Sequence, residues 1–243
     1  MMGMKFLKYF GFLATICLCA AAAALTLTSP RAKVRVDIDT GVKLSFRMQS
    51  LGRPILNSSN LGLEFLNSPA WGRVRLSRFK HHLMNRKFEM PTGKVRRVSG
   101  HYAEYNLRFR EISVPFRILE VEFRLYEDGI GFRYIIPEQI NLTHFKISQE
   151  LNPFAVAGNP WVFHLPLSFG SSFEGIYQSL PLYDLKEDQM LGLPVMMQTP
   201  TGPFVAITEA SLTDYAGLYL LPGADHQLES RLAPSLQDPA MKV

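Results

Sequence analysis

Cysteine is nearly absent from this chain: among 243 residues it occurs twice, as Cys17 and Cys19, and both lie in an apolar segment near the start. A chain that loses this segment has no cysteine left for a disulfide framework, a thiol nucleophile or a thiolate metal site. Charged residues are also few, at 19%, and the formal net charge is only +5. Because this positive balance is small and spread along the sequence, we expect no nucleic-acid partner.

Helical periodicity and catalytic fingerprints are missing as well. After residue 24, no stretch of helical length repeats its apolar residues with the period of a helix, and 16 prolines interrupt the chain. The sequence contains no G-x-S-x-G elbow, no phosphate-binding P-loop and no G-x-G-x-x-G turn. The composition excludes a collagen, a coiled coil, a multi-span membrane protein and a disordered chain, since 47% of the residues are hydrophobic.

The first 24 residues have the features of a secretory signal. Lys5 and Lys8 form a basic start, an uncharged apolar run follows, and Ala24 with the alanine two positions before it meets the small-residue rule of signal peptidase. A single transmembrane anchor is the alternative, but the second half of the run is weakly apolar alanine. We predict a cleaved signal over 1–24, one domain over 25–243, export to the periplasm or the medium, and no membrane attachment after cleavage.

The rest of the chain has the two-residue period of β-strands. Val34, Val36 and Ile38 alternate with polar residues, and a glycine-containing turn leads to a second alternating run at 44–48, which indicates a hairpin. Further strands are predicted at 61–66, 73–79, 101–112, 119–125, 132–136, 143–149 and 204–208. Each such strand has one apolar face to cover, so the pattern predicts an all-β fold, an antiparallel β-sandwich.

Prolines are dense between residues 152 and 200, where they separate short apolar runs. Proline removes a backbone donor and is rare inside central strands. We therefore predict surface crossings in this segment and no second core.

Two pairs of ionisable residues in the predicted strands are interpreted as ordinary solvent-exposed surface, with no catalytic or metal-binding role. Glu120 and Glu122 share a strand face, but this is the outer face of an amphipathic strand, so we predict no catalytic role for them. His81 and His82 are adjacent and would point to opposite faces, which disfavours a shared metal ion. With several lysines and arginines nearby, they predict a basic, solvated surface.

Glu209 stands apart because it follows the apolar run Phe204–Thr208 directly. A carboxylate at the end of a buried strand is costly unless a cation or hydrogen bonds satisfy it, which favours a site. The alternative is that Thr208 or Glu209 caps a short helical turn. The spacing alone leaves both interpretations open.

The segment FVAITEASLTDYAGLYL, residues 204–220, resembles the signature of the amino-terminal domain of glycoside hydrolase family 97. The resemblance extends to the strand at 42–46, the Leu-Gly-Leu at 61–63, the hairpin at 127–134 and the Leu-Ala-Pro at 232–234, so it covers nearly all of the chain after the leader. Members of the family are exported bacterial enzymes that cleave α-linked glucosides or galactosides.

The resemblance implies a large sandwich of the galactose-mutarotase type, packed in cis against a (β/α)8 barrel that holds both catalytic carboxylates. It assigns to Glu209 the role of a calcium ligand, with the other ligands supplied by the barrel. Trp161, Glu174 and Tyr177 are candidate contacts for an oligosaccharide with α-linked glucose or galactose. We expect the barrel to be absent from this chain, which then has no catalytic residue and no activity alone. The alternative is a stand-alone exported module that binds carbohydrate or protein.

Overall fold

The structure, a computed structural model, describes residues 25–168, 172–200 and 202–234, so the predicted signal over 1–24 lies outside the described residues. Sixteen strands and two short 3-10 helices are present in the described part: β1 (Leu25–Thr28), β2 (Val34–Asp39), β3 (Ser45–Ser50), β4 (Arg53–Asn60), β5 (Leu63–Phe65), β6 (Val74–Glu89), β7 (Arg97–Glu111), β8 (Ile118–Leu125), β9 (Ile130–Ile135), β10 (Ile147–Glu150), β11 (Trp161–Leu167), β12 (Gln178–Pro181), η1 (Leu182–Asp184), β13 (Met190–Gln198), β14 (Phe204–Ile207), β15 (Leu218–Pro222), η2 (Ala224–His226) and β16 (Leu228–Leu232). No helix in these ranges is long and apolar enough to cross a bilayer.

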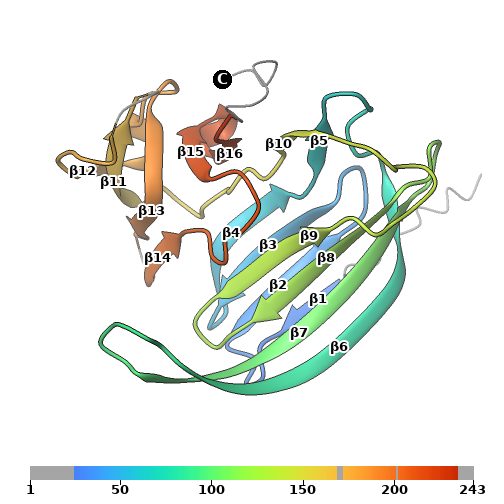
Figure 1. Cartoon of the computed structure of the whole chain (residues 1–243). Helices are drawn as coiled ribbons and strands as arrows, with labels where there is room; N and C mark the ends of the chain where they lie inside the picture. The colour runs from blue at the N-terminus through green and yellow to red at the C-terminus, as the bar shows by residue number, and fades with distance from the viewer. Residues whose placement is uncertain (1–24, 169–171, 201, 235–243) are drawn as a thin grey trace, which may run out of the picture.

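Two four-stranded antiparallel sheets form the predicted sandwich (Figure 1). One has the order β1-β2-β3-β4 and the other β6-β7-β8-β9, so neighbours in sequence are neighbours in each sheet. Their inner faces meet where the Phe46 ring contacts Phe123 and Phe132, with centroids 6.0 and 5.7 Å apart. The period-two pattern is confirmed, because Val34, Val36 and Ile38 are all buried in this core.

A third sheet overturns the prediction for residues 152–200. It has the order β12-β11-β13-β15-β16, with β14 also paired to β13, and its residues Val162, Leu191, Val195 and Met197 are fully buried. The prediction of surface crossings was wrong because three of these prolines, at 153, 160 and 200, lie between strands, and Pro166 and Pro181 lie at or next to the last residue of β11 and β12. Pro194 does lie inside β13, but at the place where the pairing of β13 with β11 shifts register, and a register shift tolerates a missing donor.

The third sheet is joined to the sandwich through short bridges. Phe154 pairs with Leu228 of β16, and Leu56 of β4 pairs with Val156. The small sheet of β10 and β5 lies at this junction, and β10 also packs against β16. One continuous cluster of buried apolar side chains includes residues of the sandwich and of the third sheet, so the whole described chain shares a core. The predicted strand over 143–149 shortens to β10.

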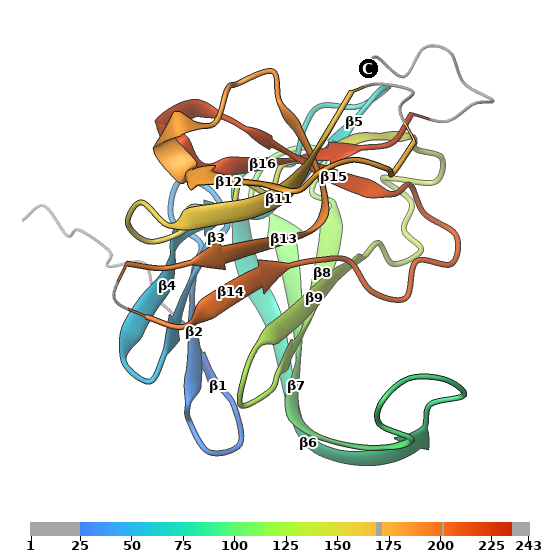
Figure 2. The ribbon, with the colours of Figure 1, turned by 90° about the vertical axis from the view of Figure 1, so that its left-hand side faces the viewer.

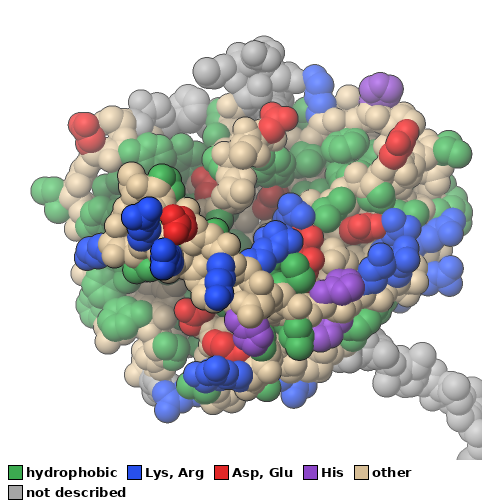
Figure 3. All heavy atoms as spheres, turned by 60° about the horizontal axis from the view of Figure 1, so that its bottom comes forward, with side chains coloured by type: hydrophobic (Ala, Val, Ile, Leu, Met, Phe, Trp, Pro, Cys, Tyr) green, Lys and Arg blue, Asp and Glu red, His purple; other side chains and the backbone are tan. Residues whose placement is uncertain are grey.

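The hairpin of β6 and β7 is the longest element and projects well beyond the sandwich (Figure 2). The strands pair from Val74 with Glu111 out to Glu89 with Arg97. Along β6 nearly every side chain is exposed, because this strand is at the edge of its sheet and its outer half has no second layer. Figure 3 shows Lys, Arg and His side chains gathered over this part of the surface.

The outer face of the β6–β9 sheet differs from its prediction in one respect. Glu120 forms an ion pair with Arg108, as expected of a solvated face. The Glu122 side chain, however, is only 8% exposed and lies between Arg124 and Arg133 at 3.0 and 3.1 Å. Glu122 is therefore a buried structural carboxylate, because the long side chains of Arg124 on its own strand and Arg133 on β9 cover it.

A fully buried arginine holds the loop between β5 and β6. The guanidinium of Arg117 donates to both carboxylate oxygens of Glu111 at 2.8 and 2.9 Å. Its remaining donors reach Ser68 and the carbonyls of Pro69 and Ala70. The Arg117 and Glu111 side chains are 1% and 3% exposed. This pair fixes the loop against the end of β7, which is a structural role that the sequence pattern does not reveal.

Candidate functional site

Glu209 lies two residues beyond β14, at the start of the connection to β15, and is half-buried. Its Oε2 accepts a hydrogen bond of 3.0 Å from the backbone N–H of Leu218, the first residue of β15. No helix begins at this point, so the alternative that the residue caps a helical turn is wrong. The carboxylate instead closes the loop of residues 210–217, and no described residue donates a hydrogen bond to its Oε1.

Glu150, at the end of β10, is a second carboxylate beside Glu209, and the charge of Glu209 acts on it directly. The Tyr215 hydroxyl, from the loop that Glu209 closes, donates a hydrogen bond to Glu150. The Asn152 side-chain amide donates to Glu150 Oε2 at 2.8 Å, and Asn152 Oδ1 accepts from the Tyr134 hydroxyl. A chain of polar contacts therefore runs from β9 through Asn152 and Glu150 to the Glu209 loop.

The electrostatics of this cluster disfavour a second full negative charge. Burial raises the pKa of Glu150, and the nearby charge of Glu209 raises it further, against the opposing hydrogen bonds from Tyr215 and Asn152. Burial followed by the charge of Glu150 also raises the pKa of Tyr215. Burial raises the pKa of Tyr134 far above its ordinary value. Two close carboxylates that repel one another are an arrangement that a cation would stabilise.

The described residues do not form a complete metal site. No group of three or more His, Cys, Asp or Glu side chains in the described ranges is arranged to hold an ion. Calcium takes six to eight oxygen ligands, so Glu209 would supply one part of its coordination shell. The donor chemistry fits calcium, because a half-buried carboxylate with a free oxygen is a hard ligand. Within the described ranges Glu209 and Glu150 are not joined by a third His, Cys, Asp or Glu side chain that could complete a site.

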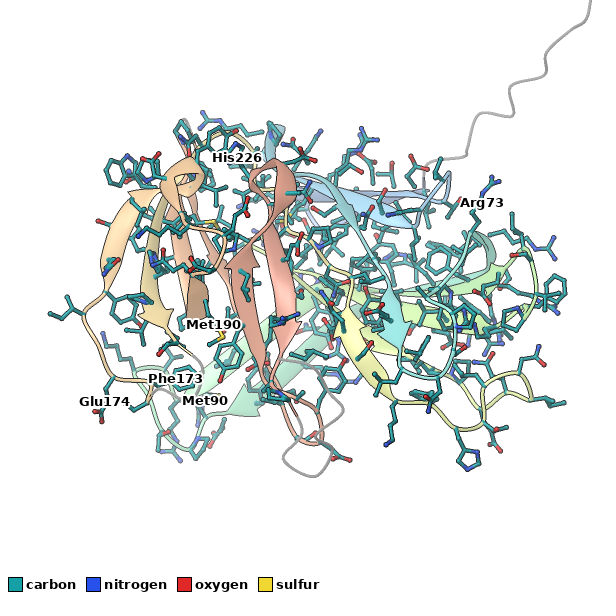
Figure 4. The ribbon with its side chains drawn as sticks, turned by 90° about the horizontal axis from the view of Figure 1, so that it is seen from above. Arg73, Met90, Phe173, Glu174, Met190 and His226 are labelled. Atoms are coloured by element: carbon teal, nitrogen blue, oxygen red, sulfur yellow. The ribbon has the colours of Figure 1, made fainter. Side chains whose placement is uncertain are left out.

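Two of the three predicted sugar contacts lie in one loop, between β11 and β12. Glu174 and Tyr177 are both exposed, Tyr177 at 60%. Figure 4 shows Glu174 pointing away from the body of the protein beside Phe173. The Phe173 ring stacks on Tyr219, with centroids 5.8 Å apart, and Tyr219 follows Leu218, the residue that bonds Glu209. The loop and Glu209 are thus connected through β15.

Trp161, the third predicted contact, is not part of this arrangement. It begins β11 and pairs with Pro181, whereas Gln178, which follows Tyr177, pairs with His164 at the other end of the same ladder. The two ends of the ladder are three residue steps apart, or about 10 Å. The Trp161 side chain is half exposed. The structure therefore places Glu174 and Tyr177 on one exposed loop and Trp161 at the other end of the β11–β12 ladder, and no described contact joins any of the three to Glu209.

Sequence reasoning missed Glu150 and Asn152. Both lie where a strand gives way to a proline-containing connection, and such polar residues normally mark a loop. Nothing in their spacing connects them to Glu209, which is 59 positions away from Glu150 in the sequence. Of the residues that contact one another here, only Tyr215 lies in the same sequence segment as Glu209. The sequence could therefore have indicated Tyr215, but not Glu150 or Asn152.

Comparisons with known proteins point in one direction. The sequence profile described as "Glycosyl-hydrolase 97 N-terminal" matches residues 27–237. A retaining alpha-galactosidase of Bacteroides thetaiotaomicron is 27% identical over 193 residues, which is 74% of this chain and 28% of that protein.

Solved structures agree with the sequence comparisons. A glycoside hydrolase family 97 enzyme from Pseudoalteromonas sp. strain K8, in complex with panose, is 24% identical and superposes with a TM-score of 0.80 over 86% of this chain and 32% of that one. The same enzyme in complex with acarbose gives a TM-score of 0.81. A beta-arabinopyranosidase is 18% identical, with a TM-score of 0.77 over 85% of this chain and 35% of that one. The chain spans about a third or less of the length of these proteins.

Proposed function

The chain belongs to the glycosyl-hydrolase 97 N-terminal family, and on this basis we propose that it is the sandwich module of a calcium-dependent α-glycosidase. In this proposal Glu209 contributes one carboxylate to a calcium ion that the module shares with a (β/α)8 catalytic barrel in cis. The module has no hydrolytic activity by itself. The intact enzyme hydrolyses oligosaccharides with α-linked glucose or galactose.

The position of the Glu209 carboxylate carries this proposal. The backbone N–H of Leu218 holds Oε2, and no described residue donates a hydrogen bond to Oε1, so one carboxylate oxygen is oriented before any ion binds. A carboxylate that is already ordered loses little conformational freedom on binding a cation. The neighbouring Glu150 adds negative potential, and the hydrogen bonds from Tyr215 and Asn152 hold it in place. Together these contacts present a rigid acidic corner at the end of β14.

The proposal assigns a separate chemical role to the calcium ion, to Glu209 and its neighbours, and to the loop between β11 and β12. Calcium at such a corner would supply positive charge that stabilises negative charge developing near the scissile bond. Glu209 holds the ion, and the Tyr215–Glu150 contact keeps the loop that carries Glu209 closed. In the proposal Glu174 and Tyr177, which share an exposed loop with Phe173, contact hydroxyls of the sugar. The substrate class is supported by the panose and acarbose complexes of the Pseudoalteromonas enzyme and by the name of the Bacteroides enzyme.

We also propose that the protein is exported and acts in the periplasm or outside the cell. The basic start at Lys5 and Lys8, the uncharged run after them and the small residues before Leu25 support this location. Amino-terminal sequencing of the protein recovered from its host tests it. A mature protein that begins at Leu25 is the expected result, whereas an intact amino terminus in the cytosol would contradict it.

Cation titration of the whole chain tests the calcium role. Terbium luminescence excited through tyrosine is expected to show weak binding that calcium competes away, because most ligands are missing. Glu209→Gln should abolish this binding, and Glu138→Gln, which neutralises an exposed carboxylate after β9, should leave it unchanged. Equal loss in both variants would show that only general charge attracts the ion and would refute the role of Glu209.

Enzymatic and sugar-binding assays distinguish the proposed enzyme module from a stand-alone carbohydrate-binding module. Neither p-nitrophenyl α-glucoside nor p-nitrophenyl α-galactoside should be turned over by the chain. Turnover above that of a Glu209→Ala variant would contradict the proposal. Calorimetric titration with malto-oligosaccharides should show weak or no binding. Tight binding to the monomeric chain would instead favour a stand-alone carbohydrate-binding module.

A further inference from the structure

Positive charge in this protein is concentrated on one element, the β6–β7 hairpin. Residues 74–111 contain ten Lys and Arg against three Glu, a net charge of +7 in a chain whose total is +5. The remainder of the chain is therefore slightly acidic. The interpretation of the positive charge as spread along the sequence was therefore wrong: it is concentrated in this segment, and the hairpin brings the cations onto one surface (Figure 3).

The cations of β6 line up on a single face of the strand. We call the basic stripe the set of five exposed side chains that point away from the sandwich core: Arg75, Arg78, Lys80, His82 and Arg86. A bulge lies between Leu76 and Arg78, and this extra residue puts Arg75 and Arg78 on the same face despite their odd spacing. Alternate residues of a strand are about 7 Å apart, so the stripe is a single row that follows the curve of β6 and is interrupted by Met84 between His82 and Arg86 (Figure 2).

On the inner strands Arg108, Arg124 and Arg133 are paired with carboxylates, but among the described residues the cations of the stripe are not. Arg108 of β7 pairs with Glu120 of β8, and Arg124 of β8 pairs with Glu104 of β7. No carboxylate of a described residue lies within 4 Å of the four lysine and arginine side chains of the stripe. Moreover, Arg75 is directly opposite Arg110, and Arg78 is opposite Arg108. Like charges in directly opposed positions destabilise a sheet, and a bound anion would relieve that repulsion.

A cavity lies at the inner end of the stripe. It has a volume of about 290 Å³ and is lined by Arg75, Arg110, Glu111, Ile112 and Phe116. The carboxylate of Glu111 is engaged by Arg117 and by the backbone N–H of Gly72, so it does not neutralise the two arginines of the cavity. The planar guanidinium groups of Arg75 and Arg110 are therefore available for a carboxylate or sulfate group.

We propose that the basic stripe and its terminal cavity form a binding site for a linear acidic polysaccharide. The site is one strand wide and carries its charges two to four residues apart along the strand, which suits an extended polymer with acidic groups at intervals. Single-stranded nucleic acid is disfavoured because no exposed aromatic side chain lies on this face between residues 75 and 86 for a base to stack on. A flat membrane would contact a broad basic surface, whereas Arg108, Arg124 and Arg133 of the inner strands are already paired.

The stripe lies on a different sheet from Glu209, so this proposal does not depend on the calcium role. It gives the protein a second carbohydrate surface, selective for acidic chains, on the edge strand of the sandwich. An enzyme with such a surface would be held on an acidic glycan while its catalytic site works on α-linked sugars elsewhere.

Affinity electrophoresis of the whole chain in gels that contain polygalacturonate tests the site. At low salt, polygalacturonate in the gel should slow the migration of the chain, and the apparent affinity should fall steeply as the salt concentration rises. Neutral amylose should not bind to the basic stripe. The triple variant Arg78→Gln/Lys80→Gln/Arg86→Gln should weaken the affinity by roughly tenfold or more, since each lost contact reduces polyelectrolyte binding.

A matched triple variant, Lys33→Gln/Lys43→Gln/Lys186→Gln, removes the same charge from exposed positions outside the hairpin. It should retain the affinity of the parent chain, and circular dichroism should show that both variants are folded. Equal weakening in the two triples would overturn the site, because net charge alone would then explain binding. If polygalacturonate does not slow the chain, the proposed site is overturned. The charges of the stripe would then serve only to prevent β6, an edge strand, from pairing with another chain. Tighter binding to phosphatidylglycerol vesicles or to oligothymidylate than to polygalacturonate would overturn the assignment to a polysaccharide.

Discussion

Replacement of Arg117 by methionine should destabilise this protein more than any ordinary surface change. Methionine keeps much of the packing against the rings of Phe65 and Trp71, over which the guanidinium lies at 5.4 and 4.7 Å. It removes both hydrogen bonds to Glu111, however, and leaves that carboxylate buried with only backbone donors. Removal of one partner of a buried ion pair costs about 3–5 kcal/mol, and we expect a loss of this size in the free energy of unfolding.

The pair also predicts how stability depends on pH. Burial alone would raise the pKa of Glu111, but hydrogen bonds from Arg117 and Gly72, with the charge of Arg117, hold it below its ordinary value of 4.5. A carboxyl group with a lowered pKa in the folded state stabilises the protein above the unfolded pKa. This stabilisation should therefore be complete above about pH 5 and should be lost as the pH falls through the folded pKa.

Urea unfolding followed by tryptophan fluorescence measures both effects, since one of the two tryptophans, Trp71, touches the guanidinium. The double variant Glu111→Gln/Arg117→Met should be less destabilised than the sum of the single variants, because it leaves no unpaired buried charge. The exposed pair of Arg97 with Glu89 supplies the control, and Arg97→Met should leave stability nearly unchanged. The reasoning is refuted if Arg117→Met costs less than about 1 kcal/mol or if the two single effects simply add.

Two further substitutions test other parts of the structure. Burial and the charge of Glu209 raise the pKa of Glu150, so the folded state binds a proton there more tightly than the unfolded chain, and stability should decline as the pH rises above about 4.5. Glu150→Gln should therefore stabilise the protein more at pH 8 than at pH 4 in thermal melts, and a gain independent of pH would contradict the raised pKa. Leu51 in the β3–β4 turn is exposed and has a φ of 49°, a left-handed conformation that costs leucine about 1 kcal/mol and that asparagine tolerates. Leu51→Asn should raise the midpoint of urea unfolding, and an unchanged or lower midpoint would show that the leucine side chain compensates for its backbone.

The strands of the sandwich were predictable because their information is local. Alternation such as that of Val34, Val36 and Ile38 requires one buried face, and a glycine-containing turn supplies the reversal. The third sheet was not predictable in this way. Its strands β11 and β13 pair across a separation of about thirty residues, and prolines at their ends and at a register shift hide their period.

The candidate site shows the same division. Glu209 could be singled out because a carboxylate directly after an apolar strand is unusual, and the surrounding segment carries the family signature. Glu150 could not, since only the pairing of β10 with β5 and its packing on β16 bring it to the Glu209 loop. The same holds for Trp161. Its aromatic side chain suggested a sugar contact, but it lies at the end of the β11–β12 ladder that is remote from Tyr177.

The sequence by itself determined that this protein is built of antiparallel strands, that it belongs among the amino-terminal domains of family 97, and that Glu209 follows a buried strand. These features depend on residue order over a few positions, which chain geometry converts directly into faces and turns. Only the tertiary structure decided that Glu150 faces Glu209, that Glu122 and Arg117 are buried, and that the cations of β6 form an unpaired row. Those outcomes depend on which strands pair and in which register, and a shift of one residue would have turned every one of these side chains to the other face.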